Sequence, residues 1–148
     1  MTQEDKELLL KDLYTRLPYG TIIRHEGWNY EWDDTLTTRE RVTGIDGNFI
    51  YTEVLNSKTM EAYRVDKWPI STFDDKPYLR PMSSMTEEEH DDAYSNEVVM
   101  SLNPDTGIYA ICALSPKGYD WLNAHHFDYR GLIEKGLALE APEGMYND

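Results

Sequence analysis

Residues 35–65 read TLTTRERVTGIDGNFIYTEVLNSKTMEAYRV. In this stretch, two groups of turn-forming residues separate three segments that contain β-branched and aromatic residues. Segments 35–42 and 48–54 flank Gly44-Ile45-Asp46-Gly47, and an Asp-Gly pair between two such segments is a good hairpin signal. Asn56-Ser57-Lys58 forms a second turn, after which residues 60–65 continue as another strand. The stretch therefore predicts an antiparallel meander within residues 20–66, in a pattern that also allows a small barrel.

Upstream of this stretch, residues 2–17 have the pattern of an amphipathic helix. Thr2 is a suitable N-cap, the first turn contains Glu4 and Asp5, and leucines recur at spacings of three and four. Pro18 cannot continue a helix, so we expect the helix to end just before it.

Between this helix and the meander, the β-branched run 21–24 predicts the first strand and Glu26-Gly27 a turn. The next residues alternate with a period of two, which places Trp28, Tyr30 and Trp32 on one face of a strand. Flat rings on one face can form a platform for a sugar or a base, or an interface with a partner. The same alternation is the normal mark of a strand with one buried side, and we favour the core.

Downstream of the meander, residues 67–82 contain Pro69, Pro77 and Pro81, and we expect an extended connector that lies across a surface without central pairing. Further elements are then expected in this order: a short acidic helix from Thr86, a hairpin of residues 98–102 and 108–114, a helix after Ser115-Pro116, one or two helical turns over 129–135 ending at Gly136, and a loose tail after Pro142.

These elements together predict an α+β fold in which an N-terminal helix and C-terminal helices pack on an antiparallel sheet. The length of 148 residues suits one domain, residues 1–148. Within it we expect two sub-lobes, 1–66 and 83–148, joined by the connector 67–82.

The chain is strongly acidic, with 28 Asp and Glu against 14 Lys and Arg and a formal net charge of −14. This balance disfavours direct contact with nucleic-acid phosphates or with anionic lipid. A sharper interpretation is that the acids imitate a phosphate backbone and occupy the groove of a basic partner, although solubility is the simpler explanation.

The single cysteine, Cys112, cannot form an internal disulfide, which favours a reducing compartment. The N-terminus has acids where a signal peptide needs bases, and no apolar run approaches a membrane-spanning length. We therefore expect a cytoplasmic protein.

Sequence motifs for catalysis or metal binding are missing. His125 and His126 are adjacent and point about 100° apart on a helix, so they cannot chelate one ion. Cys112 lies in an apolar run that predicts a buried, inert thiol. The sequence therefore predicts no catalytic residue, no metal ligand and no cofactor.

Residues 87–92 hold the densest acidic cluster: Glu87, Glu88, Glu89, Asp91 and Asp92. These acids suit the start of a helix, where the positive end of the helix dipole stabilises them, and we favour a solvated helix start. As a functional site, the cluster would dock on a basic partner.

Two stretches carry a resemblance. Residues 76–89, KPYLRPMSSMTEEE, and 127–142, FDYRGLIEKGLALEAP, resemble segments of a family of uncharacterised small proteins from gut anaerobes, many of them encoded on prophages or other mobile elements. The resemblance covers the C-terminal half of the chain. Because no activity is attached to that family, it implies a cytoplasmic, mobile-element context and transfers no functional residue.

The sequence therefore predicts a non-catalytic acidic accessory protein that acts by protein–protein contact, with a basic partner, without direct binding of nucleic acid or membrane and with its oligomeric state left open. Two alternatives remain: an enzyme or small-ligand binder with a pocket beside the 28–32 strand, and a nucleic-acid mimic. The candidate interaction residues are Trp28, Tyr30, Trp32, Glu87, Glu88, Glu89, Asp91 and Asp92.

Overall fold

The computed structural model describes residues 1–29, 34–106 and 109–146, which form three α-helices and eight strands. In chain order these are α1 (Gln3–Thr15), β1 (Ile22–Asn29), β2 (Asp34–Ile45), β3 (Phe49–Leu55), β4 (Ala62–Pro69), β5 (Lys76–Leu79), α2 (Glu87–Ser95), β6 (Val98–Leu102), β7 (Tyr109–Leu114), α3 (Pro116–Ala124) and β8 (Leu139–Glu140). The fold is α+β, as predicted. None of these helices is long and apolar enough to span a membrane.

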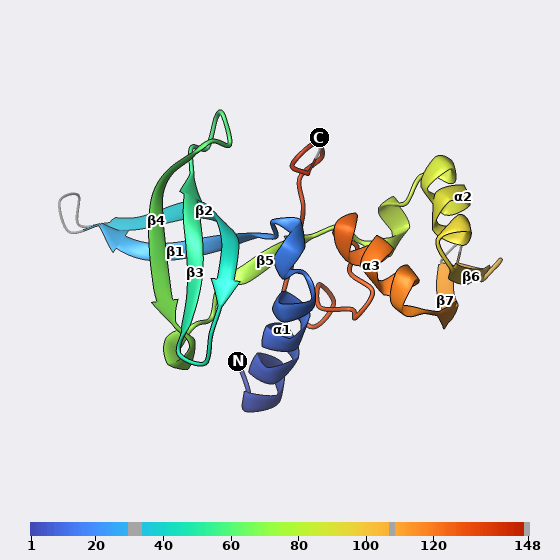
Figure 1. The fold of residues 1–148 in the computed structure, drawn as a ribbon, viewed down its shortest axis with the longest axis horizontal. Coiled ribbons are helices and arrows are strands. Elements are labelled where there is room, and N and C mark those ends of the chain that lie inside the picture. Colours follow the sequence, from blue (N-terminus) through green and yellow to red (C-terminus); the bar gives the residue numbers. More distant parts are fainter. Residues whose placement is uncertain (30–33, 107–108, 147–148) are drawn as a thin grey trace.

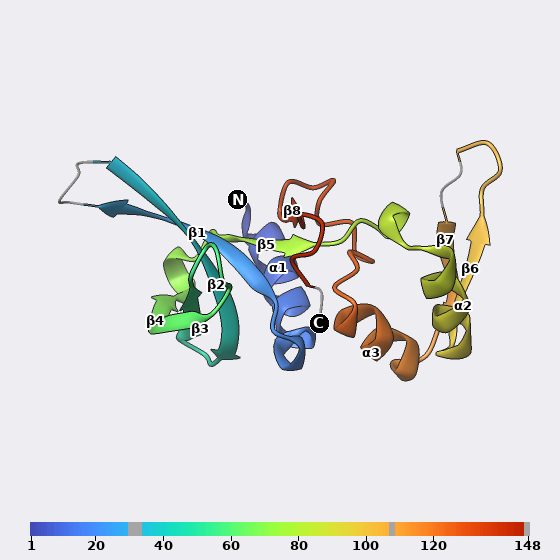
Figure 2. The ribbon, with the colours of Figure 1, turned by 90° about the horizontal axis from the view of Figure 1, so that it is seen from above.

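The molecule is elongated, with its two sheets far apart. β1 to β4 occupy one end, α1 lies near the middle, and α2 with the β6–β7 hairpin forms the opposite end (Figure 1). The view from above keeps the two sheets at opposite ends (Figure 2). We call residues 1–79 the sheet region and residues 82–126 the hairpin region.

The larger sheet has six strands in the order β4-β3-β2-β1-β5-β8. β1 to β4 pair antiparallel with their sequence neighbours, which confirms the meander. β5 and β8 pair parallel, so the sheet is mixed and the prediction of a purely antiparallel sheet is wrong in this detail. β4 and β8 are its two edges, so the sheet stays open and the barrel-like alternative is also wrong.

The expectation that residues 67–82 lie across a surface without central pairing is wrong. β4 continues to Pro69, and β5 pairs with β1 on one side and β8 on the other. Pro77 lacks an N–H group and weakens this short strand, but Tyr78 and Leu79 are buried, and the apolar area they remove from water favours the pairing. The turn expected at Glu26-Gly27 is also wrong, because both residues lie within β1.

Helix α1 begins and ends where the sequence predicts. The Thr2 hydroxyl accepts the N–H of Asp5 at 3.0 Å, and the Asp5 carboxylate accepts the N–H of Thr2 at 3.2 Å, a reciprocal capping box. The helix buries Leu9 and Leu13 completely or nearly so against the sheet, which stabilises the fold by about 1.5–3 kcal/mol for each side chain. The core cluster around them contains Ile23, Val42, Ile50, Phe73, Leu79, Leu132, Leu137 and Ala138.

A buried carboxylate holds the core side of the meander together. Glu40 of β2 is fully buried and accepts hydrogen bonds from Thr52 at 2.7 Å, Trp68 at 2.8 Å and Thr38 at 2.7 Å. Because these donors come from β2, β3 and β4, the side chain of Glu40 ties three strands in one register.

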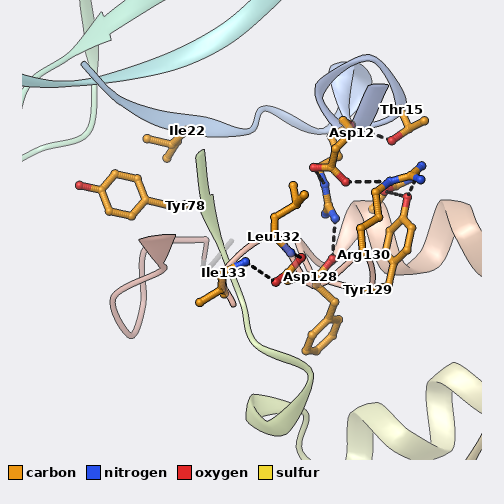
Figure 3. Close-up of polar contacts among 12 residues, drawn as sticks. Asp12, Thr15, Ile22, Tyr78, Asp128, Tyr129, Arg130, Leu132 and Ile133 are labelled. Atoms are coloured by element: carbon orange, nitrogen blue, oxygen red, sulfur yellow. Dashed lines mark hydrogen bonds and ion pairs between the residues drawn. The ribbon is translucent and has the colours of Figure 1, made fainter. Parts of the chain in front are cut away.

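A buried arginine joins α1 to the C-terminal segment. Arg16 donates from Nε to the Asp12 carboxylate at 2.8 Å and from Nη2 to the carbonyl oxygen of Phe127 at 2.6 Å. Arg130 approaches the second oxygen of Asp12 at 3.1 Å. Figure 3 shows Arg130 beside Asp12, with Tyr129 adjacent. Asp12 therefore balances two cations at the junction of the sheet and the C-terminal segment.

The helical turns expected at residues 129–135 are absent, and this part of the described chain forms consecutive tight turns. The Asp128 carboxylate accepts the N–H groups of Leu132 and Ile133, each at 2.9 Å, in competition with helical pairing (Figure 3). Gly136 has a φ of +74°, which confirms the left-handed position predicted for it.

The tail from Pro142 to Tyr146 is ordered, so the prediction of a loose tail is wrong for these residues. The Tyr146 hydroxyl accepts the N–H of Ile22 at 2.9 Å and donates to the carbonyl oxygen of Tyr78 at 2.7 Å. Its ring stacks on His126 with centroids 3.6 Å apart. The hydroxyl thus links β1 to β5, which explains the ordered tail.

Candidate functional site

The acidic cluster lies on α2, and one of its members, Glu89, holds the start of this helix in place. Glu89 forms the capping box with Thr86 and accepts both guanidinium nitrogens of Arg80 at 2.7 Å. The Arg80 hydrogen bonds lower the pKa of Glu89 to about 2. Glu89 therefore fastens the start of α2 to the chain that follows β5, and its charge is already neutralised.

Asp92 also accepts hydrogen bonds from other residues of the hairpin region. Its carboxylate accepts the indole N–H of Trp121 at 2.8 Å, which joins α2 to α3. Asn96 also donates to its backbone oxygen at 2.7 Å. Of the five predicted acids, these two hold the hairpin region together.

The other three acids form an exposed ridge. Glu87, Glu88 and Asp91 are exposed and have no ion pair within the described residues. We call them the acidic ridge. The helical spacing of three and four places Tyr94 beside this ridge, and its side chain is 72 % exposed. The ridge thus combines negative charge with an exposed ring.

The β6–β7 hairpin packs its inner face on the helices. Val98, Met100, Ile111 and Leu114 belong to the cluster that contains Trp121 and Leu122 of α3. Its opposite face carries small or apolar side chains that are all exposed: Val99, Ser101, Ala110, Cys112 and Ala113. We call this set the hairpin face.

The prediction that Cys112 is buried is wrong. The pairing register passes from Ala113 to Ile111 opposite Val99 and Met100, so Cys112 is the extra residue of a β-bulge. A bulged residue leaves the regular alternation, and the thiol is therefore exposed.

A close approach between α3 and the hairpin fixes this arrangement. A Cβ at Gly118 would lie 2.6 Å from Leu114 Cδ1 and 3.0 Å from the carbonyl oxygen of Glu97. Glu97 has a φ of +66°, and its carboxylate accepts the hydroxyl of the α3 N-cap, Ser115, at 2.6 Å. The absence of a side chain at Gly118 therefore lets α3 contact the hairpin backbone directly.

The hairpin region carries a disproportionate share of the charge. Residues 82–126 contain eight acidic residues and one basic residue, Lys117, a formal charge of −7 out of −14 for the whole chain. The hairpin face is thus an uncharged patch within the most acidic part of the molecule.

The aromatic residues predicted at 28–32 lie outside the described residues: Tyr30 and Trp32 entirely, and Trp28 in its side chain. The backbone of Trp28 pairs with Thr35 at the end of β1. Whether these rings face the core stays an open prediction.

A second feature, missed by the sequence interpretation, is a cleft of about 810 Å³ between Arg80, His126 and Tyr146. His126 has a φ of +63°, and its buried Nδ1 has no hydrogen-bond partner in the described structure. Burial, together with the positive charges of Arg16, His125 and Arg80, lowers the pKa of His126 to about 4. A lone histidine after a helix gives no sequence signal for this environment.

Within the described ranges, no group of three potential metal ligands lies close enough together to hold an ion. His125 contacts the carbonyl oxygen of Trp121 through Nδ1 at 2.8 Å. His25 and Asp75, 50 residues apart, form a 2.7 Å pair that sequence spacing could not reveal. The His25 ring stacks on Trp68 at 3.9 Å, and the hydrogen bond to Asp75 raises the pKa of His25.

Comparisons with protein-family models, with curated proteins and with solved structures found no match for this chain. Its function must therefore be inferred from the geometry of its own residues.

Proposed function

We propose that this protein is a non-catalytic, cytoplasmic interaction protein that docks on a basic protein partner through its hairpin region. The observation that carries this proposal is the hairpin face, an exposed apolar patch inside a region of formal charge −7. Apolar patches surrounded by charge are typical of protein-binding surfaces.

The hairpin itself supports an interaction role. A two-stranded sheet is marginally stable in water unless something packs on it, and here the helices cover one face. The hairpin face and the strand edges offer both apolar area and backbone groups to a partner. The expected contact is therefore a partner strand or helix laid against β6–β7.

The acidic ridge specifies the charge of the partner. Glu87, Glu88 and Asp91 have no counter-ion in the described structure, so a basic surface would gain favourable long-range attraction to them. A second copy of this acidic chain would be repelled. The ridge lies within the first five residues of a single helix, Glu87 to Asp91, which supports local docking more than mimicry of an extended phosphate backbone.

A mobile-element context remains part of the proposal through the resemblance of residues 76–89 and 127–142. A surface that offers charge and apolar contact in place of reactive groups suits an accessory protein that acts by protein–protein contact.

The experiment is an NMR titration of the protein with a synthetic peptide of alternating lysine and valine, at low salt. The triple variant Glu87→Gln, Glu88→Gln, Asp91→Asn should bind the peptide about tenfold more weakly, because three rim charges together contribute about 1.4 kcal/mol. A Val99→Asp variant, which alters the hairpin face and adds no positive charge, should weaken binding as well.

The matched control is the triple variant Glu4→Gln, Glu7→Gln, Glu61→Gln, which changes the net charge equally at exposed sites outside the hairpin region. Chemical-shift changes confined to α2, β6 and β7, and a control that binds like the wild type, support the proposal. Equal losses in both triple variants would mean that only overall charge matters, and the proposal would fail.

A further inference from the structure

The second exposed sheet surface lies on the six-stranded sheet, on the face opposite α1, beside the part where Ile22, Leu55 and Tyr78 are buried with the C-terminal tail. Residues directly opposite each other in neighbouring strands point to the same face. Arg24 of β1 lies opposite Arg39 of β2 and Lys76 of β5, and Arg41 follows two residues after Arg39. Four basic side chains therefore share one face of the sheet with two acids, Glu26 and Glu53, which pair with Arg24 and Arg41.

A hollow of about 550 Å³ lies on this face. The polar residues Thr37, Arg39, Asn56 and Ser57 line it, together with Tyr63 and Tyr78. The volume falls within the usual range of small-molecule sites, and the lining combines flat rings with a few polar groups.

Arg39 differs from the other arginines. Arg16, Arg24, Arg41, Arg64, Arg80 and Arg130 each form an ion pair with a carboxylate. Arg39 has no such pair within the described chain, and its guanidinium carbon lies 5.6 Å from the centroid of the Tyr78 ring. Stacking on a ring holds the cation in place while its N–H edge stays available to an oxyanion.

The rings indicate the rest of the ligand. Tyr78 is buried beneath Arg39, whereas Tyr63 stands 62 % exposed on β4 at the same hollow. An exposed tyrosine ring offers a flat surface for a second flat ring at small entropic cost. Together the lining fits an oxyanion at Arg39 and a planar group at Tyr63.

We propose that this hollow binds a small molecule that combines a phosphate or carboxylate group with a planar ring, of about the size of a mononucleotide, with Arg39 as the oxyanion-binding residue. This site is separate from the proposed docking surface on the hairpin region, and its ligand has the opposite charge.

Four probes separate the two parts of the ligand: AMP and benzoate carry a ring and an oxyanion, adenosine carries a ring alone, and inorganic phosphate carries an oxyanion alone. NMR titration should show that AMP or benzoate shifts the signals of residues around Arg39 and Tyr63. Adenosine and inorganic phosphate should each bind at least about tenfold more weakly, because each lacks one of the two contacts. AMP against benzoate distinguishes phosphate from carboxylate.

Arg39→Gln should weaken binding of the better probe at least about tenfold, and Tyr63→Ala, at an exposed side chain, should weaken it several-fold without unfolding the sheet. The control is Arg64→Gln on the same edge strand as Tyr63, because Arg64 is paired with Asp66 and does not line the hollow.

Three results would overturn the proposal: no shift with AMP or benzoate at millimolar concentration, binding to Tyr63→Ala and Arg39→Gln equal to that of the wild type, or an equal loss in Arg64→Gln. Much tighter binding of a short single-stranded oligonucleotide that depends equally on Arg24 and Arg39 would also overturn it, since an extended nucleic-acid surface would then replace the small-molecule site.

Discussion

The molecule has two sheet surfaces that are at least partly exposed, and they differ in charge. The open face of the large sheet presents Arg24, Arg39, Arg41 and Lys76, whereas the hairpin face is uncharged and lies in a region of formal charge −7. A net charge of −14 therefore does not describe either surface. The difference teaches that an acidic protein can keep a local site for anions if its basic residues gather on one side of one sheet.

The two regions also differ in how they are stabilised. In the sheet region, helix α1 covers a wide core and Glu40 satisfies three donors from three strands. In the hairpin region, a two-stranded sheet depends on a smaller cluster and on the contact at Gly118. Substitutions at Asp12, Gly118 and His126 measure how much the junction, the hairpin contact and the cleft each contribute to stability.

The largest effect is expected from Asp12→Ala at the junction. The substitution leaves Arg16 fully buried without its carboxylate, and removal of one partner of a buried ion pair costs about 4 kcal/mol. Arg130 loses the same partner. Urea unfolding measures the free energy directly.

The control for this substitution is Glu26→Ala, which removes a 3.7 Å ion pair with Arg24 at the surface. We expect it to cost less than about 1 kcal/mol. If Asp12→Ala costs no more than this control, the buried network does not hold the sheet to the C-terminal segment, and the two regions are stabilised independently.

A smaller and local effect is expected from Gly118→Ala. The end of the Leu114 side chain can move, but the carbonyl oxygen of Glu97 at 3.0 Å belongs to the backbone, so α3 must shift. We expect a cost of about 3 kcal/mol confined to the hairpin region. Hydrogen exchange should accelerate in β6 and β7 and stay unchanged in β2 and β3. Gly47→Ala is the control, because within the described residues no heavy atom beyond its two chain neighbours lies within 4 Å of its added Cβ.

If exchange accelerates equally in both sheets after Gly118→Ala, the hairpin region does not unfold as a separate unit. The contrast in stability between the two regions would then be lost, although their contrast in charge would remain.

The sequence predicts elements well where the deciding contacts are local. The capping boxes of Thr2 with Asp5 and of Thr86 with Glu89 mark two helix starts, and the turn residues between strands mark the meander. In each case the interacting groups are three or four residues apart, so the pattern is visible in the chain.

Prediction fails where a distant group changes a local preference. β5 contains a proline, yet it pairs because its apolar residues are buried between β1 and β8. Residues 129–135 have helical spacing, yet the Asp128 carboxylate takes the N–H groups of Leu132 and Ile133. A β-bulge exposes Cys112 in an apolar strand. None of these outcomes follows from spacing alone.

The candidate sites show the same limit. The acidic cluster is visible in the sequence, but only the fold separates the exposed Glu87, Glu88 and Asp91 from Glu89 and Asp92, which bind Arg80 and Trp121. The hollow at Arg39 has no sequence signal, because its lining comes from β2, β4, β5 and the turn after β3. Its defining property, an arginine without a carboxylate partner among the described residues, exists only in three dimensions.

The smallest of the three stability effects is a pH dependence at the cleft between the regions. Burial holds the pKa of His126 at about 4 in the folded protein, below the ordinary value of 6.5 for histidine. Between these two values the unfolded chain binds a proton that the folded protein does not, so the free energy of unfolding falls as the pH is lowered from 6.5 to 4. The loss should be about 2 to 3 kcal/mol and should level off below pH 4.

His126→Asn isolates this contribution, because asparagine tolerates the φ of +63° and does not titrate. Urea unfolding across this pH range should give a flatter dependence for the variant than for the wild type. The carboxylate of Glu89, with a pKa of about 2, contributes mainly below pH 4.5, where the unfolded chain binds a proton at Glu89 that the folded protein does not. Identical slopes for wild type and variant between pH 6.5 and 4 would show that His126 is protonated equally in both states, and that the cleft admits enough water to solvate its charge.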